Sequence, residues 1–164
     1  MKSNMTPAYG WGPIGRRVIE PVPHGHWKTI TFLAALRSTG LVAPLVIDGA
    51  MNGGLFRAYV RQHLVTELRP GDLVVMDNLP SHKVAGVAEA IREAGAEVVY
   101  LPPYSPDLNP IEQVFSKAKA EIRRRKPRTV AATEDLCGAA VDWIAAEESR
   151  RYIRHAGYGT QGSR

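Results

Sequence analysis

Two short apolar runs place the strongest constraint on how this chain can fold. Asp72–Met76 contains LVVM, and Ala96–Leu101 contains VVYL. Continuous apolar runs of this length are typical of strands that are buried on both faces. Between them, Lys83–Ala94 has the pattern of a helix that ends at Gly95. These runs predict strands covered by helices.

Upstream of these strands the sequence predicts a hairpin and a helix. Thr29–Arg37 and Leu41–Ile47 are apolar, partly β-branched runs, and Ser38-Thr39-Gly40 separates them. We expect the pair to form a β-hairpin. Leu55–Leu68 carries apolar residues at spacings of three and four, which predicts an amphipathic helix closed by Pro70-Gly71.

The remaining segments complete an α/β pattern. Residues 1–28 begin with a Gly- and Pro-rich stretch without helical or strand period, so we expect an irregular segment there. Asn109 to about Arg125 is predicted to be a helix, and residues 129–164 a helical tail with a helix over Thr133–His155 in one or two pieces. The 164 residues, 45% of them hydrophobic, predict one domain of two or three layers.

Positive charge is concentrated in one segment. The whole chain carries a formal net charge of +5. Residues 117–128 contain seven basic side chains and one acidic one, Glu121. A solvated helix end is the simpler interpretation, because cations suit a helix C-terminus. So many cations exceed that need, and we favour contact with the DNA backbone. The candidate DNA-binding residues are Lys117, Lys119, Arg123, Arg124 and Arg125.

The cysteine content and hydropathy indicate where the chain works. Cys137 is the only cysteine, which excludes an intrachain disulfide and a zinc ribbon. No apolar run approaches the roughly 20 residues that span a bilayer, and the start lacks a signal-peptide pattern. We expect a soluble, cytoplasmic protein.

Asp77 is the first candidate for chemistry. It stands where the apolar run Asp72–Met76 meets a polar loop. Ligands of open α/β sheets collect at the carboxyl ends of strands, so this carboxylate is a candidate metal ligand. The alternative is an Asx-turn that merely ends the strand.

Glu112 is the second candidate, and it admits two interpretations. Asn109, Pro110 and Glu112 fit the N-cap, N1 and N3 positions of a helix start, so Glu112 can be a capping residue. Glu112 also heads a polar line along the helix, followed by Ser116, Lys119 and Arg123. The two roles are compatible.

An apolar stripe beside this polar line predicts how the helix packs. Its members are Ile111, Val114, Phe115, Ala118 and Ile122, and we expect them to face a sheet. If the helix starts next to the strand end at Asp77, both carboxylates can share Mg²⁺ or Mn²⁺. Asn78 and His82 are auxiliary candidates, with His82 near a phosphate or a metal-bound water. A hydrogen bond at a helix start is the alternative for His82.

Three stretches together resemble a known family. LVVMDNLPSHK, VVYLPPYSPDLNPIEQVFSKAK and VPHGHWKTITFLAAL are similar to the DDE endonuclease domain of insertion-sequence transposases in the mariner-related superfamily. The resemblance implies an RNase H-like fold, with a mixed sheet flanked by helices. It implies Asp77 as the second and Glu112 as the third catalytic acid, with 34 residues between them. It also implies DNA cleavage and strand transfer at a two-metal site, with transposon ends and target DNA as partners.

The chain departs from this family pattern near its start. In the family, a first catalytic aspartate lies on a central strand upstream of a segment resembling KSNMTPAYGWGPIGRR, but here no acid occurs before Glu20. We therefore expect an N-terminally truncated domain that lacks the first acid, its central strand and the helix-turn-helix modules. Asp48 is a poor substitute, because it aligns with a different strand end.

The departure keeps several functions open. A catalytic domain without its first acid is expected to be nearly inactive unless an upstream transposase half or a second copy contributes. The alternative is a non-catalytic remnant that binds DNA or a transposase and modulates transposition. An unrelated α/β enzyme acting on small phosphorylated molecules is a third interpretation, but the chain has no Gly-rich phosphate loop.

Overall fold

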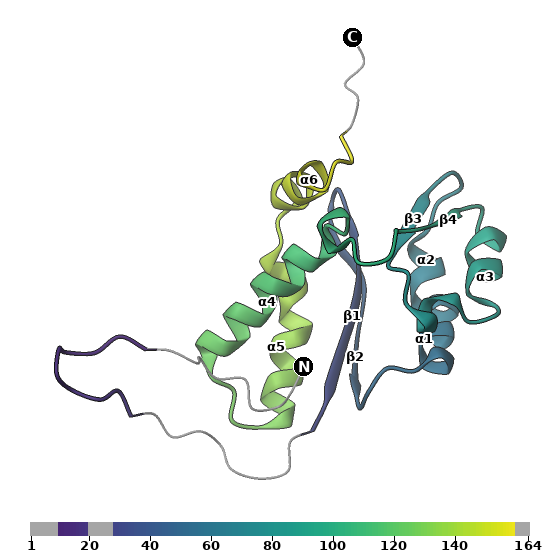
Figure 1. Cartoon of the computed structure of the whole chain (residues 1–164). Helices are drawn as coiled ribbons and strands as arrows, with labels where there is room; N and C mark the ends of the chain where they lie inside the picture. The colour runs from purple at the N-terminus through teal and green to yellow at the C-terminus, as the bar shows by residue number, and fades with distance from the viewer. Residues whose placement is uncertain (1–9, 20–27, 160–164) are drawn as a thin grey trace.

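The structure is a computed structural model that describes residues 10–19 and 28–159. Helices cover both sides of a central hairpin (Figure 1). The strands are β1 (Ile30–Arg37), β2 (Gly40–Asp48), β3 (Leu73–Met76) and β4 (Glu97–Tyr100), and the α-helices are α1 (Gly53–Tyr59), α2 (Val65–Glu67), α3 (Val87–Glu93), α4 (Ile111–Arg125), α5 (Val130–Ala139) and α6 (Ala146–His155). The predicted α/β class is confirmed.

The predicted hairpin is confirmed and contains a bulge. β1 and β2 pair antiparallel from Ile30 opposite Asp48 to Arg37 opposite Gly40. The register shifts between Leu33 and Ala35, so β2 holds one extra residue near Pro44. Proline lacks the N–H that a ladder needs, which is why it occurs at edges and bulges.

The predicted helix over Leu55–Leu68 is continuous in space but irregular in its hydrogen bonding. α1 continues through a π-helical turn, Val60–Leu64, into α2. The Asn52 side chain caps the start by accepting the Leu55 N–H at 2.9 Å. The buried Tyr59 hydroxyl donates to the Ala43 carbonyl at 2.9 Å, which ties the helix to the bulge of β2.

The prediction that β3 and β4 are buried on both faces is wrong. They form a parallel pair, with Leu73 opposite Glu97 and Met76 opposite Tyr100. Leu73 is 64% exposed and Val99 43% exposed. Helices pack against one face only, where Met76 is buried, and β1–β2 form a separate sheet.

The predicted helix over Lys83–Ala94 is shorter in the structure. Pro80–Lys83 forms a 3₁₀ turn, and α3 begins only after Gly86. Gly86 has φ of +90°, a left-handed conformation that interrupts a regular helix. The Glu89 carboxylate accepts the Gly86 N–H at 2.8 Å and so fixes the later start of α3.

The C-terminal helices agree with the expected pieces. α5 is followed by a 3₁₀ turn, Ala140–Trp143, and then by α6. Ile144 leaves the helical conformation with φ of −114° and ψ of 99°. Cys137 is buried here, and burial raises its pKa to about 11. This thiol therefore belongs to the core.

Residues 10–19 contain neither helix nor strand, as expected for the start of the chain. A turn from Pro13 to Arg16 is closed by a 3.1 Å backbone hydrogen bond, and Trp11 is fully exposed. The other residues of the predicted irregular segment, except residue 28, lie outside the described residues. No helix in the described ranges has the length and apolar character needed to cross a membrane.

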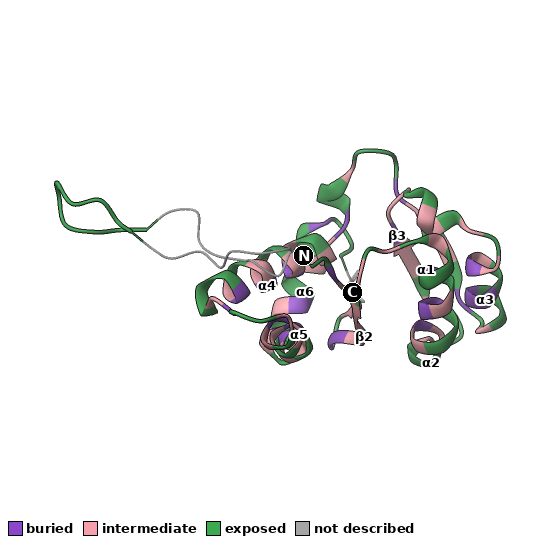
Figure 2. Cartoon of the chain, turned by 90° about the horizontal axis from the view of Figure 1, so that it is seen from below, coloured by how far each residue is buried: buried purple, intermediate pink, exposed green. Residues whose placement is uncertain are grey.

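Two hydrophobic cores lie on opposite faces of the hairpin. Ile30 and Phe32 of β1 point to one side, and Leu33 and Ala35 to the other. Helices α4–α6 and α1–α3 accordingly lie on either side of β2 (Figure 2). Buried members of the α4–α6 core are Ile30, Phe32, Leu41, Val114, Ala118, Ile122, Cys137, Ala140 and Ile144.

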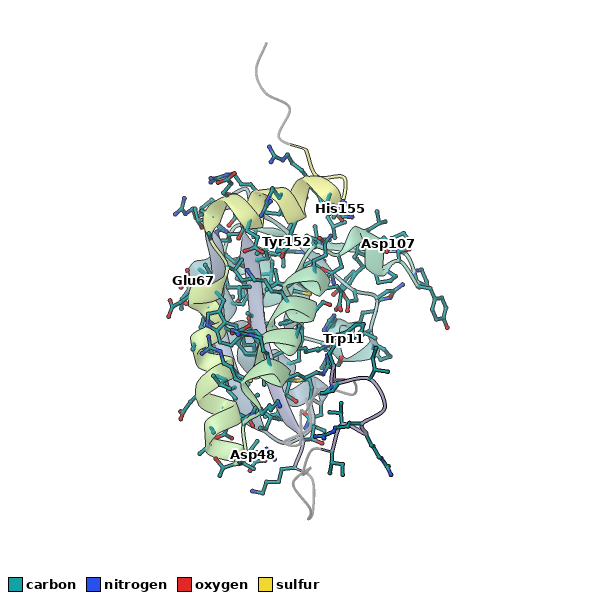
Figure 3. All side chains as sticks on the ribbon, turned by 90° about the vertical axis from the view of Figure 1, so that its left-hand side faces the viewer. Trp11, Asp48, Glu67, Asp107, Tyr152 and His155 are labelled. Carbon is teal, nitrogen blue, oxygen red and sulfur yellow. The ribbon has the colours of Figure 1, made fainter. Side chains whose placement is uncertain are left out.

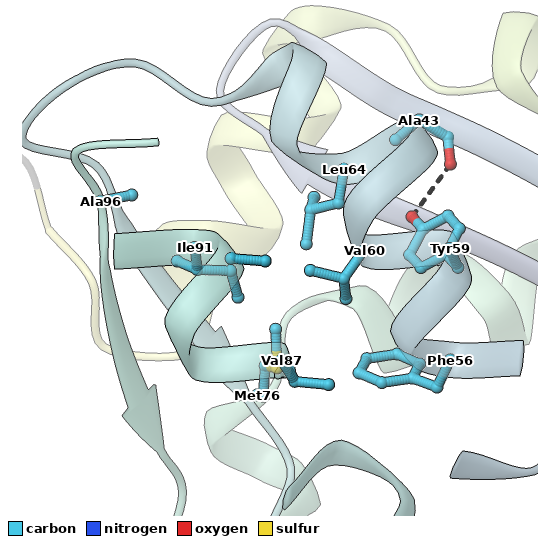
Figure 4. Packing of buried hydrophobic residues seen from close by; sticks show 10 residues of the cluster. Ala43, Phe56, Tyr59, Val60, Leu64, Met76, Val87, Ile91 and Ala96 are labelled. Carbon is cyan, nitrogen blue, oxygen red and sulfur yellow. Dashed lines mark hydrogen bonds between the residues drawn. The ribbon is translucent and has the colours of Figure 1, made fainter. Parts of the chain in front are cut away.

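The α1–α3 core joins the hairpin to the β3–β4 pair. Figure 4 shows its close packing together with the Tyr59–Ala43 hydrogen bond. Its buried members are Ala43, Phe56, Tyr59, Val60, Leu64, Met76, Val87, Ala90, Ile91 and Ala96. A second link is ionic, because the Arg37 guanidinium donates to Asp72 at 2.8 and 2.5 Å. The end of β1 is thereby held beside the start of β3.

The stability of the fold is expected to depend on the α4 stripe. We predict that Ile122→Ala lowers the free energy of unfolding by about 2–5 kcal/mol, because Ile122 is fully buried. Leu73→Ala, on the exposed face of β3, is the matched control and should change it by no more than about 0.5 kcal/mol. Urea unfolding measures both, and equal losses would contradict the proposed burial.

Candidate active site

Asp77 lies directly after β3 and is half-buried. One oxygen of its carboxylate, Oδ1, accepts a short hydrogen bond from the Asn109 side-chain amide. The partners are 32 residues apart, so this contact is not the local Asx-turn considered as the alternative. Asp77 is instead tied to the segment that leads into α4.

The capping interpretation of Asn109 and Glu112 is wrong. α4 begins at Ile111 with Pro110 as N-cap, and no side chain caps it. The start of a helix can be assigned one residue earlier or later, but the hydrogen bond of the Asn109 side chain excludes a capping role under either assignment. The Asn109 amide donates to Asp77 instead of accepting a helix N–H. The exposed Glu112 carboxylate has no hydrogen-bond partner among the described residues.

The same asparagine brings the two acid-bearing segments together. Its backbone carbonyl accepts the Glu112 N–H at 3.1 Å while its amide contacts Asp77. One residue therefore touches the carboxylate at the strand end and the backbone of the glutamate at the helix start. The expected approach of α4 to the end of β3 is found at this point.

The donor chemistry of these two acids fits a hard divalent cation. Mg²⁺ is commonly held by one or two carboxylates, with water or phosphate oxygens completing the shell. Asp77 Oδ2 and the Glu112 carboxylate carry no hydrogen bond from other described residues. Over residues 10–19 and 28–159, no group of three or more His, Cys, Asp or Glu side chains is arranged to hold a metal. Asp77 and Glu112 are therefore candidates for at most two ligands among the described residues.

His82 is held beside Asp77 by backbone and ring contacts. Its Nδ1 lies 3.2 Å from the Asp77 carbonyl oxygen. A carbonyl can only accept, so Nδ1 is the nitrogen that donates, and Nε2 has no hydrogen-bond partner among the described residues. The ring stacks on Phe56 with centroids 4.3 Å apart. A structural hydrogen bond, the alternative role for His82, therefore accounts for Nδ1 but not for Nε2. Asn78, the other auxiliary candidate, is half-buried next to Asp77.

Asp48 does not join this site. It ends β2 and forms an ion pair with Lys28 at 2.9 Å. Figure 3 shows Asp48 at the opposite end of the molecule from Asp107, which lies in the loop before α4. The Asp48 carboxylate is thus paired with Lys28, and no hydrogen bond among the described residues links it to Asp77.

Comparison with known proteins identifies the family. Residues 1–134 match the sequence profile of the DDE superfamily endonucleases. The chain belongs to this family. No curated protein matches it by sequence.

Solved structures similar to this DDE endonuclease chain show its fold. The Mos1 transposase paired-end complex with left transposon end has a TM-score of 0.69 and 13% identity, covering 95% of this chain and 50% of that one. The catalytic domain of Mos1 mariner transposase has a TM-score of 0.60 and 14% identity, covering 79% of this chain and 74% of that one. The predicted RNase H-like fold is confirmed. The chain spans about half the length of the Mos1 chain in that complex.

The basic residues of this DDE endonuclease chain fall into two groups along α4. Lys117 contacts Glu148 at 2.6 Å and the Trp143 carbonyl at 2.9 Å. Arg124 and Arg125 both donate to Glu121, at 2.7–2.9 Å. These three candidates therefore already have internal partners. They line an open groove of about 380 Å³ beside Trp143, with Arg125 4.8 Å from the ring centre.

Lys119 and Arg123 form the second group. Neither has an ion pair with any described residue, and both follow Glu112 along the predicted polar line. Val114, Ala118 and Ile122 are buried on the adjacent stripe, as predicted. α4 starts beside Asp77 with Glu112 in its first turn. Lys119 and Arg123 therefore lie further along the same helix, on the side next to its buried stripe.

Asn109 is the site residue whose role sequence reasoning missed. An extended residue before proline fits both an N-cap and a loop that reaches elsewhere, so the local pattern does not separate them. The partner of the Asn109 amide distinguishes the two, and that partner, Asp77, is 32 residues away in the sequence.

The arginine contacts of Glu121 make a prediction about its titration. Hydrogen bonds from Arg124, and then from Arg125, lower the Glu121 pKa from 4.5 to about 2. A lowered folded pKa adds stability above pH 4.5 that is lost as the pH falls towards 2. We predict that Arg124→Gln raises this pKa in a carboxyl ¹³C NMR titration.

Arg150→Gln on α6 is the control and should leave the Glu121 titration unchanged. A wild-type midpoint near the ordinary value of 4.5 would contradict the two contacts.

Proposed function

We propose that this chain supplies Asp77 and Glu112 as metal-holding carboxylates of a DDE transposase that cleaves DNA and transfers strands. The observation that carries the proposal is the Asn109 contact, which joins the strand end at Asp77 to the helix start at Glu112. Family membership supports the class of reaction, and the Mos1 catalytic-domain structures with Mg and Mn support a divalent metal.

A bound Mg²⁺ or Mn²⁺ would polarise the scissile phosphodiester and lower the pKa of an attacking water or hydroxyl. Asp77 and Glu112 would hold the cation between the sheet and the helix. In hydrolysis the water oxygen would form a new P–O bond while the bond to the 3′ oxygen breaks, and that oxygen leaves as a 3′-hydroxyl. In strand transfer this hydroxyl would form a P–O bond to a second phosphodiester, whose own 3′ oxygen leaves and takes up the proton. Lys119 and Arg123 would hold the DNA phosphates along α4.

A full two-metal site needs a further ligand. Among the described residues no group of three or more His, Cys, Asp or Glu side chains is arranged to hold a metal. We therefore propose that efficient cleavage requires a third carboxylate from an upstream transposase half or from a second copy of the chain. We propose that the protein is encoded by an insertion sequence and acts on bacterial DNA in the cytoplasm.

The two-acid site also favours a second candidate function. A chain that binds DNA and a transposase, but does not cleave, would modulate transposition without its own catalysis. Metal binding without DNA cleavage fits both functions. Cleavage that is restored by adding a third acid would favour the enzyme.

The first test measures Mn²⁺ binding by calorimetry on the full chain. We expect Asp77→Ala and Glu112→Ala each to abolish the measured binding, because each removes one of two ligands. Asp135→Asn, on the exposed face of α5, is the control for loss of one negative charge and should bind as the wild type does. Unchanged binding in both site variants would refute the metal site.

Plasmid nicking tests catalytic competence with the same proteins. With Mg²⁺ we expect the chain alone to nick supercoiled plasmid only marginally above background. Rapid nicking that Asp77→Ala abolishes would show that two carboxylates suffice, and it would overturn the need for a third.

The second test concerns DNA. We expect the double variant Lys119→Gln/Arg123→Gln to weaken duplex binding similarly for all sequences. It should also reduce the slope of log K against log [salt] by about 2, about one for each lost phosphate contact. Fluorescence anisotropy between low and high salt measures this slope.

Arg150→Gln/Arg154→Gln on α6 is the matched control, because it removes the same net charge from exposed side chains. We expect it to leave the salt slope nearly unchanged. Equal effects of the two double variants would indicate a general charge effect and would contradict a DNA track along α4.

A further inference from the structure

Asn109 has the properties of a residue that acts on the site through another residue. It is one of the few buried polar side chains in the described ranges, with 9% of its surface exposed. A buried amide is retained at little cost only when it is hydrogen-bonded. Its identified partner is the Asp77 carboxylate, which can only accept, so the NH₂ group faces Asp77. The amide orientation is therefore fixed by chemistry.

The neutral side chain of Asn109 is suited to a position beside a bound cation. An amide donates to Asp77 Oδ1 without bringing a positive charge that would repel a metal. It also leaves Oδ2 of Asp77 without a hydrogen bond from the described residues. Partners of this kind fix the orientation of metal ligands, and their loss typically weakens metal binding about 10- to 100-fold.

The backbone around Asn109 is held without help from its side chain. The Asn109 N–H donates to the Pro106 carbonyl at 2.9 Å, and its carbonyl accepts the Glu112 N–H at 3.1 Å. The Tyr158 hydroxyl donates to the neighbouring Leu108 carbonyl at 2.8 Å. On the other side, the Leu101 N–H donates to the Met76 carbonyl at 2.8 Å, next to Asp77. Removing the amide should therefore leave both segments in place.

We propose that Asn109 is a positioning residue that sets the rotation of the Asp77 carboxylate and links it to the start of α4. The proposal rests on the proposed function, since the orientation matters for a metal held by Asp77 and Glu112. It assigns Asn109 no contact with the reacting atoms. Its amide acts only through Asp77.

The experiment compares Asn109→Ala with Thr129→Ala in the full chain. Thr129 accepts the Ala132 N–H at 3.1 Å as the N-cap of α5, so its variant also loses one side-chain hydrogen bond. We expect Asn109→Ala to weaken Mn²⁺ binding about 10- to 100-fold in calorimetry. Thr129→Ala should bind within about twofold of the wild type, with urea unfolding confirming that both variants fold. Wild-type affinity in folded Asn109→Ala overturns the proposal.

An NMR measurement tests the contact without metal. We expect the Asn109 side-chain amide protons to be shifted downfield in the wild type and to move upfield in Asp77→Asn, because a charged acceptor is lost. Amide signals that do not respond to Asp77→Asn refute the positioning role, whatever the metal result. A responding amide in a wild-type chain that binds no Mn²⁺ upholds the contact and refutes only the metal site.

Discussion

The β1–β2 hairpin is the constraint on which the rest of the structure depends. Its strands carry apolar side chains on both faces, with Ile30 and Phe32 on one side and Leu33 and Ala35 on the other. Each face needs a covering layer, because exposed apolar surface of this extent is unfavourable in water. α4–α6 cover one face and α1–α3 the other, so a two-stranded sheet organises two cores.

The two cores together position the candidate site, because one core holds β3 and the other holds α4. Burial of Met76 holds β3 in the α1–α3 core and places Asp77 at its end. Burial of Val114 and Ile122 holds α4 in the α4–α6 core and places Glu112 at its start. Asn109 joins the two ends. The segments that carry the two acids are therefore positioned by packing elsewhere in the molecule, and the Asn109–Asp77 hydrogen bond links them.

Local sequence patterns predicted most helices and strands. The predictions that failed depend on contacts between residues that are far apart in the sequence. The hairpin, the helix from Leu55 and the stripe on α4 follow from periodicity, which depends only on neighbouring residues. Exposure of Leu73 depends on which elements cover β3, and the run LVVM does not reveal that. The Asn109 amide and the Glu121–arginine contacts likewise depend on the final positions of side chains. Asp77 and Glu112 were candidates from their positions at a strand end and a helix start, and the resemblance implied their roles. The Asn109 contact between their segments required coordinates.

The bulge in β2 has a consequence for association between molecules. A strand that approached β2 from outside would meet Pro44, which has no N–H to donate. The adjacent Ala43 carbonyl already accepts the Tyr59 hydroxyl. The outer margin of the hairpin is therefore a poor template for another chain, which protects the protein from edge-to-edge aggregation along β2.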